Sequence, residues 1–168
     1  MWPDTVAIVT RVLVTGMSGT GKSSALVELG KRGFRVVDTD DPGWKEWVAS
    51  PDEPGGGEWL WIEERMTELL RPDEDRTLFV QGCVRNQVKF YDRFDAVVLL
   101  SAPAKVILER ITRRTTNPYG KAPAEREEIL YNLATVEPAL RANCTHEIDA
   151  SRSLDDVVTE LIAIAHRS

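Results

Sequence analysis

Short apolar runs alternate along this chain with segments in which apolar residues recur every three or four positions. The runs are rich in Val, Leu, Ile and Phe and lack regular polar alternation, which predicts strands buried on both faces. They cover residues 11–15, 35–38, 77–81, 96–101 and 145–149. Strands that alternate with helices are typical of a parallel sheet covered by helices on both sides. We therefore expect a single three-layer α/β/α domain over residues 1–168.

Three segments between or after these strands carry apolar residues at helical spacing, which predicts one buried stripe on each helix. The stripes are Trp59, Ile62, Met66 and Leu69; Ile129, Leu133, Val136 and Leu140; and Leu154, Val157, Val158, Leu161, Ile162 and Ala165. The last one follows Ser153 and Asp156, which are placed as in a capping box. We interpret Trp47 and Trp59 as core anchors of helices.

Two segments interrupt the pattern and predict loops because they are rich in Pro, Gly and polar residues. They are residues 50–57 and 115–123. Neither one separates domains, since strands on both sides are needed for one sheet. We interpret them as mobile elements over a site. The first lies in an expected acceptor-binding insertion over residues 41–70, and the second in an expected lid over residues 110–126.

The strongest candidate site is Gly16–Ser23, which reads G-x-x-x-x-G-K-S between a predicted strand and a predicted helix. Glycines allow successive backbone N–H groups to form a nest for phosphate, and the helix N-terminus adds a positive dipole end. Lysine reaches the β- and γ-phosphates, and the serine hydroxyl ligates Mg²⁺. The residues expected to bind ATP here are Gly16, Ser18, Gly19, Thr20, Gly21, Lys22, Ser23 and Ser24.

Charged residues follow the second and third predicted strands, at the edge of the sheet where ligands bind in open α/β folds. Asp38 and Asp40 follow the second strand, and Arg85 comes just after the third. We expect Asp38, with Ser23, on the metal side and Asp40 as the group that orients or deprotonates an attacking hydroxyl. A helix cap or solvated turn is the alternative for this pair. Arg85 is a candidate for holding an anionic acceptor, or a plain surface arginine.

Arginines and tryptophans supply the remaining candidates. Arg110 and Arg114 enter the expected lid and are catalytic candidates, since closing arginines neutralise the charge of phosphoryl transfer. A solvated basic helix end is the alternative. Arg126 follows the lid and, with Trp44 and Trp61, is assigned to acceptor binding, where indole rings form an apolar or stacking wall.

Composition narrows the class of protein. The chain has 168 residues, of which 42% are hydrophobic and 29% charged, with a net charge of −6. Those values are typical of a globular domain and argue against non-specific binding to nucleic acid or anionic membranes. Cys83 and Cys144 lack metal-ligand spacing and favour reduced thiols, and residues 1–4 lack the basic region of a signal peptide. We expect a cytoplasmic protein that is a monomer or weak dimer.

The chain resembles the P-loop kinases related to nucleoside monophosphate kinases, which include adenylate, shikimate and gluconate kinases. Beyond the P-loop, Gly82–Gln87 resembles the adenylate kinase signature G-F-P-R-T, and Glu109–Arg114 resembles the start of that family's lid. The resemblance implies contacts of Arg110 and Arg114 with ATP phosphates, an adenine-side loop at Asp149, and a return from the lid at Arg126. It further implies a five-stranded sheet of order 2-3-1-4-5 and the cofactors ATP and Mg²⁺.

Departures from the family's motifs leave the identity of the phosphoryl acceptor unassigned. Asp38-Thr39-Asp40 resembles the D-S-D of shikimate kinases, but the G-G-G after the third strand is absent and Gln81 replaces the usual aspartate. Residues 117–121 resemble the lid of actinobacterial ATPases described as shikimate-kinase-like. The leading hypothesis is a small-molecule kinase with a hydroxyl acceptor. The alternatives are a nucleoside monophosphate kinase and an ATP-binding regulatory protein with weak or no kinase activity.

Overall fold

The computed structural model describes residues 10–71, 76–115 and 117–167. Its central sheet has five parallel strands, and each lies where the apolar runs predict one. The strands are β1 (Arg11–Thr15), β2 (Arg35–Asp38), β5 (Leu78–Gln81), β6 (Ala96–Ser101) and β7 (His146–Asp149). The spatial order is β2-β5-β1-β6-β7. Counted among the parallel strands alone, this is the expected 2-3-1-4-5, and the fold class is confirmed.

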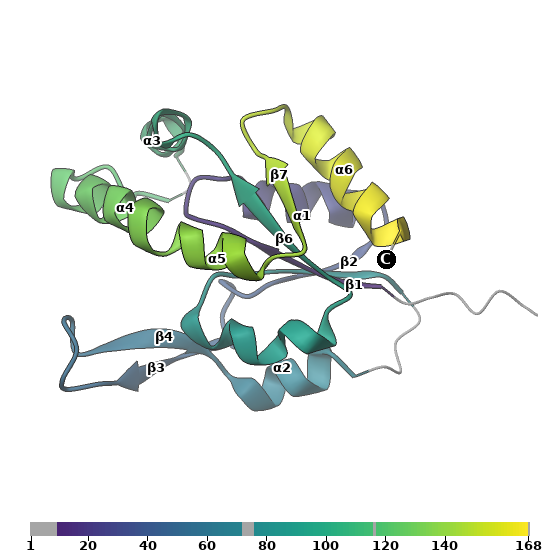
Figure 1. The fold of residues 1–168 in the computed structure, drawn as a ribbon, viewed down its shortest axis with the longest axis horizontal. Coiled ribbons are helices and arrows are strands. Elements are labelled where there is room, and N and C mark those ends of the chain that lie inside the picture. The colour runs from purple at the N-terminus through teal and green to yellow at the C-terminus, as the bar shows by residue number, and fades with distance from the viewer. Residues whose placement is uncertain (1–9, 72–75, 116, 168) are drawn as a thin grey trace, which may run out of the picture.

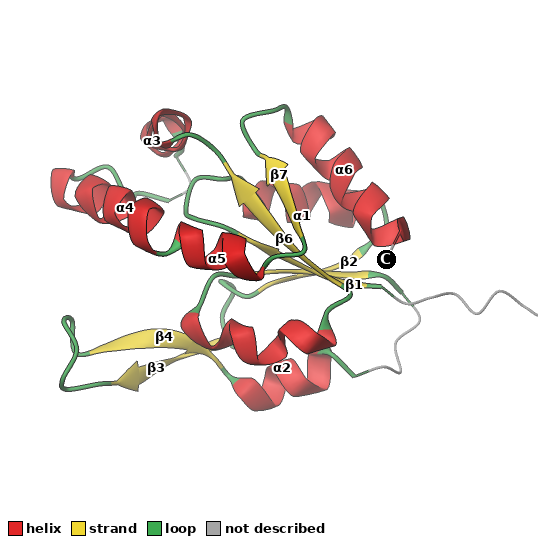
Figure 2. Ribbon diagram, in the orientation of Figure 1, coloured by secondary structure: helices red, strands yellow, loops and turns green. Residues whose placement is uncertain are grey.

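Helices lie on both sides of the sheet (Figures 1 and 2), and the apolar side chains of the two sides pack against different helices. Val12 and Val14 point to one side, where α1 (Lys22–Lys31), α3 (Ala104–Arg113) and α6 (Leu154–Arg167) complete the main core. Leu13 points to the other side, toward α2 (Glu63–Leu69) and the 3₁₀ helix η1 (Arg85–Arg93). This alternation follows from the period of two in a β-strand. Both faces of the sheet are therefore covered, as in other doubly wound folds.

The segment after β2 differs from the expectation. Residues 45–61 form an antiparallel hairpin of β3 (Lys45–Ala49) and β4 (Gly57–Trp61), with residues 50–56 as its turn. The prediction that Trp47 and Trp59 are core anchors of helices is wrong, because both side chains lie on strands and are 49% and 55% exposed. Helix α2 begins only at Glu63. Figure 1 shows the hairpin projecting from the body of the molecule beside α2.

The helical stripe from Ile129 to Leu140 is divided between two helices. Helix α4 (Pro123–Thr135) ends before Val136, and α5 (Glu137–Asn143) begins with Pro138 in its first turn. Proline lacks the N–H that would continue the α4 hydrogen-bond ladder, so a new helix starts there. The expected cap of the last helix is present in part, since the Asp156 N–H donates to Ser153 Oγ at 3.1 Å.

Two sequence-based expectations fall partly outside the described residues. The start of the chain, on which the absence of a signal peptide rests, belongs to residues 1–9, and the expected lid includes residue 116. Within the described ranges, no helix combines the length and the hydrophobicity that a membrane crossing requires.

Candidate active site

The P-loop joins β1 to α1 and packs directly against the end of β6. Gly16 has φ of +147°, and a Cβ at this position would lie 2.4 Å from the carbonyl oxygen of Leu100, so the loop requires glycine there. Lys22 folds back over the loop and donates from Nζ to the carbonyl oxygens of Gly16 at 2.7 Å and Met17 at 3.0 Å. Burial lowers the pKa of Lys22, while neighbouring anionic groups, Asp40 and Asp38 among them, oppose the shift.

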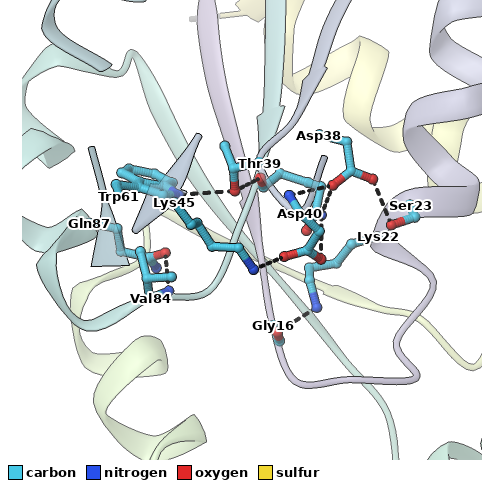
Figure 3. A network of polar contacts seen from close by, with 11 residues as sticks. Gly16, Lys22, Ser23, Asp38, Thr39, Asp40, Lys45, Trp61, Val84 and Gln87 are labelled. Atoms are coloured by element: carbon cyan, nitrogen blue, oxygen red, sulfur yellow. Dashed lines mark hydrogen bonds and ion pairs between the residues drawn. The ribbon is translucent and has the colours of Figure 1, made fainter. Parts of the chain in front are cut away.

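A polar network links the ends of β2 and β5 to the P-loop (Figure 3). Ser23 donates from Oγ to Asp38 Oδ2 at 2.9 Å. Asp38 and Gln81 are partners in the register of the two strands, and Gln81 donates from Nε2 to Asp38 Oδ1 and, at 3.0 Å, to Asp40 Oδ2. The neutral amide of Gln81 thus bridges the two carboxylates with its two N–H groups.

Asp40 has a second partner, which the sequence reasoning missed. Lys45, the first residue of β3, places Nζ 2.7 Å from Asp40 Oδ1 (Figure 3). Burial acts to raise the pKa of Asp40, but hydrogen bonds from Lys45 and Gln81 and the charges of Lys45 and Lys22 together hold it below its usual value. Asp40 is therefore an ionised carboxylate at neutral pH.

The oxygens of Ser23, Asp38 and Asp40 match the preference of Mg²⁺ for hard oxygen ligands. The described residues contain no group of three or more His, Cys, Asp or Glu side chains that could hold a metal ion by themselves. Mg²⁺ does not need such a group, because it usually keeps several waters and is bound through one or two carboxylates together with substrate phosphates. Ser23 and Asp38 have the geometry for that role.

A cavity of about 490 Å³ lies over the P-loop and collects most of the expected nucleotide-binding residues. Its walls are Ser18–Ser24, Asp40, Arg110, Arg114, Asn117, Ala150, Arg152, Leu154 and Val157. Gly16, at the start of the loop, does not line the cavity. Asp149 does not line the cavity, since its Oδ1 accepts hydrogen bonds from the backbone N–H and the hydroxyl of Ser151, but the adjacent Ala150 does. Asn117 belongs to the expected lid, whereas Arg152 and Leu154 are additions from the structure that no sequence motif assigned to the site.

The lid arginines have different roles in the structure. Arg114 donates to the carbonyl oxygens of Asn117 and Tyr119, and its own carbonyl accepts from Lys121 Nζ at 2.6 Å, so it organises the loop as well as lining the cavity. Burial lowers the pKa of Arg114. Arg126 lies outside the cavity. It donates to Thr112 Oγ1 at 3.0 Å and lines a separate surface pocket between α3 and α4.

The remaining acceptor-binding candidates do not line the cavity either. Trp61 is 1% exposed, packs against Phe90 and donates from Nε1 to Thr39 Oγ1 at 2.9 Å, so it is a core residue that fixes the base of the hairpin. Trp44 is half-buried. Arg85 reaches the hairpin instead, with Nη1 3.1 Å from Glu53 Oε1 and Nε 3.2 Å from Glu58 Oε2.

Comparisons with known proteins agree with this geometry. A family model described as an AAA domain matches residues 12–131. No curated protein matches the sequence. Among solved structures, a shikimate kinase from Acinetobacter baumannii in complex with shikimate is 17% identical, with a TM-score of 0.63 over 94% of this chain and 93% of that one. A gluconokinase from Sinorhizobium meliloti 1021 is 19% identical, with a TM-score of 0.61 over 94% and 92%. At these identities the likeness is one of fold.

Proposed function

The chain belongs to the AAA domain family, and on that premise we propose that it is an ATP-dependent kinase of small molecules. In this proposal a hydroxyl oxygen of the acceptor attacks the γ-phosphorus of ATP·Mg²⁺. The bond from that phosphorus to the β–γ bridging oxygen breaks, which yields the phosphorylated acceptor, ADP and a proton. The fold shared with shikimate kinases and a gluconokinase supports this class of reaction.

The observation that carries the proposal is the separation of the two carboxylates. Asp38 accepts a hydrogen bond from Ser23, the P-loop residue that ligates Mg²⁺ in this motif. Asp40 instead forms part of the cavity wall. Asp40 would orient the attacking hydroxyl and accept its proton. When Mg²⁺ is bound, it would neutralise charge that develops on the phosphates, and Ser23 and Asp38 would hold it.

Cations around the cavity would stabilise the transferring group. Lys22 would exchange its bonds to the loop carbonyls for the β- and γ-phosphates, and Arg110 and Arg114 would neutralise the equatorial oxygens from the lid. Such preorganised charges contribute several kcal/mol to transition-state stabilisation, with loss of one donor costing roughly 10²–10³ in rate.

The test is ADP release from ATP·Mg²⁺ against a panel of hydroxylated acceptors and nucleoside monophosphates. We expect one hydroxylated acceptor to stimulate release, with Lys22→Ala abolishing turnover and Asp40→Asn lowering kcat while ATP affinity is retained. Stimulation by AMP, CMP or GMP would instead identify a nucleoside monophosphate kinase. Tight ATP binding with no stimulation by any acceptor would favour a regulatory nucleotide-binding protein.

A further inference from the structure

Beyond Asp40, which forms part of the cavity wall, residues 39–71 and 76–93 have an unusual charge arrangement, and we call them the acceptor side. From it we infer that the acceptor is a small polyhydroxylated compound that carries an amino group and no carboxylate or phosphate. This inference rests on the kinase function proposed above and names the substrate class of the same site. An anionic acceptor would need a cation that is free to bind it, because a charged group taken from water requires a partner.

Arg85 and Lys45, two cations of the acceptor side, are already engaged. Arg85 is held between Glu53 and Glu58, and its hydrogen bond to Glu53, with the charges of both carboxylates, raises the pKa of Arg85 further. Lys45 is paired with Asp40. A carboxylate or phosphate on the acceptor would have to displace an intramolecular carboxylate to reach either cation.

The other described cations of the acceptor side are engaged or distant. Arg65 donates to the carbonyl of Gly43 and lies over the ring of Trp44, 4.5 Å from its centroid. Lys89 is paired with Glu63 at 3.0 Å, and Arg93 lies over the ring of Phe90. Arg71 and Arg76 both precede β5, and the carbonyl of Arg71 accepts a hydrogen bond from Arg11 at the beginning of β1, so both lie at the end of the strands opposite the site.

Oxygen atoms that can accept hydrogen bonds are abundant on the acceptor side. Residues 41–70 contain eight acidic and two basic residues. Within the described chain, Glu46 and Asp52 belong to no ion pair. Next to both site carboxylates, Gln81 is fully buried and its Oε1 has no hydrogen-bond partner among the described groups. The local field therefore favours a ligand that brings N–H or O–H donors and positive charge.

The hairpin adds an aromatic surface suited to such a ligand. Because side chains alternate along a strand, Trp47 and Trp59 lie on the same face as Lys45, whose ammonium reaches Asp40. The two indoles meet edge to face with centroids 5.7 Å apart, and about half of each remains exposed. The faces of indole rings attract ammonium groups, and tryptophan is the strongest side chain for this contact.

The test compares three six-membered ring compounds that differ in charge: 2-deoxystreptamine with two ammonium groups, neutral myo-inositol, and the carboxylate shikimate. Binding is followed by intrinsic tryptophan fluorescence with ADP and Mg²⁺ present, so that it does not depend on turnover. We expect 2-deoxystreptamine to bind at least about tenfold more tightly than myo-inositol, with shikimate the weakest. Its affinity should fall with added salt and with Trp47→Ser.

Two double variants test whether the affinity for shikimate depends on the release of Arg85 or only on the net charge of the protein. Glu53→Gln with Glu58→Gln releases Arg85 and is expected to raise the affinity for shikimate about tenfold. Glu64→Gln with Glu68→Gln makes the same change in net charge on exposed positions of α2 and leaves the Arg85 pairs intact. This control should leave the affinity for shikimate unchanged.

Three results of the binding experiments would overturn the inference. They are shikimate binding as tightly as 2-deoxystreptamine, no preference among the three probes, and equal shifts in the two double variants. A dimer that Trp47→Ser dissociates, with probe binding unchanged, would assign the indole face to a second copy of the chain and also overturn it. A charge preference in binding without ADP release would refute the kinase function and leave the preference standing.

Discussion

Replacing Gln81 by glutamate tests whether its amide holds the two site carboxylates together. Gln81 is fully buried, and its Nε2 donates to both Asp38 and Asp40. The substitution keeps the size of the side chain, removes both donors and adds a third carboxylate. Gln81→Met is the matched control, since it removes the donors without adding charge.

The expected stability losses of the two variants depend on how far the interacting groups are buried. A hydrogen bond to a charged group contributes about 1.5–3 kcal/mol, but the Asp40 side chain is 60% exposed, so water replaces much of that bond. We expect Gln81→Met to lower the free energy of unfolding by about 2 kcal/mol. An uncompensated buried charge costs about 3–5 kcal/mol, so Gln81→Glu should lower the free energy of unfolding by about 4 kcal/mol near pH 8.

The sign of the pH dependence separates the two variants. In folded Gln81→Glu, burial and repulsion by Asp38 and Asp40 raise the pKa of the introduced carboxyl above its unfolded value. The folded state then binds more protons than the unfolded state, and its stability falls as pH rises. We therefore measure urea unfolding from pH 4 to pH 8 in EDTA. The loss of unfolding free energy relative to the wild type should grow with pH for Gln81→Glu and stay nearly constant for Gln81→Met.

Magnesium provides a second readout of the same geometry. A divalent cation that binds only the folded state stabilises it, so Mg²⁺ should raise the unfolding midpoint of Gln81→Glu more than that of the wild type. If Gln81→Glu unfolds within about 0.5 kcal/mol of the wild type at pH 8 in EDTA, the amide does not bridge the carboxylates, because such small effects are typical of unconstrained surface changes.

Two further changes test the lid and the base of the hairpin. Gly120→Ala should destabilise the protein by about 1–3 kcal/mol in thermal unfolding, because Gly120 has φ of +94° and a Cβ would lie 2.6 Å from Ile111 and 2.7 Å from Ile129; an unchanged midpoint would contradict this packing. Lys45→Met should lower stability at pH 7 by up to about 1 kcal/mol, since the exposed pair with Asp40 is screened by water. Lys45 lowers the pKa of Asp40 in the folded state, so its contribution is present above the unfolded pKa and lost as pH falls through the folded one; a deficit that does not shrink as pH falls below the unfolded pKa would refute the pairing.

Local sequence signals predict the parts of the structure that depend on local chemistry. The five parallel strands appear as apolar runs because both of their faces are buried, and the P-loop is readable because its function depends on the backbone of a few consecutive residues. The hairpin was missed because Trp59, Ile62, Met66 and Leu69 happen to fit helical spacing across the boundary between β4 and α2. The turn at residues 50–56, between two short aromatic segments, was the available signal for it.

In the site, contacts between residues that are far apart in the chain limit what can be predicted from the sequence. Asp38 and Gln81 meet because β2 pairs with β5, and Arg85 is engaged because the hairpin brings Glu53 and Glu58 to it. Neither contact follows from spacing along the chain. The sequence therefore indicates which residues carry charge near the site but not which of them are already neutralised.

The way the hairpin is attached has a consequence for how this protein can diversify. Of the ten residues in β3 and β4, only Trp61 is buried, and Asn86 holds the backbone of Trp61 through both its N–H and its C=O. The anchoring is thus concentrated at one end, while residues 46–58 extend away from the sheet. That outer part can change in length and composition without disturbing the nucleotide-binding half. Under the kinase function proposed above, it is a natural place for acceptor preference to change during evolution, and for a designer to introduce a new preference while Lys45 and Trp61 stay fixed.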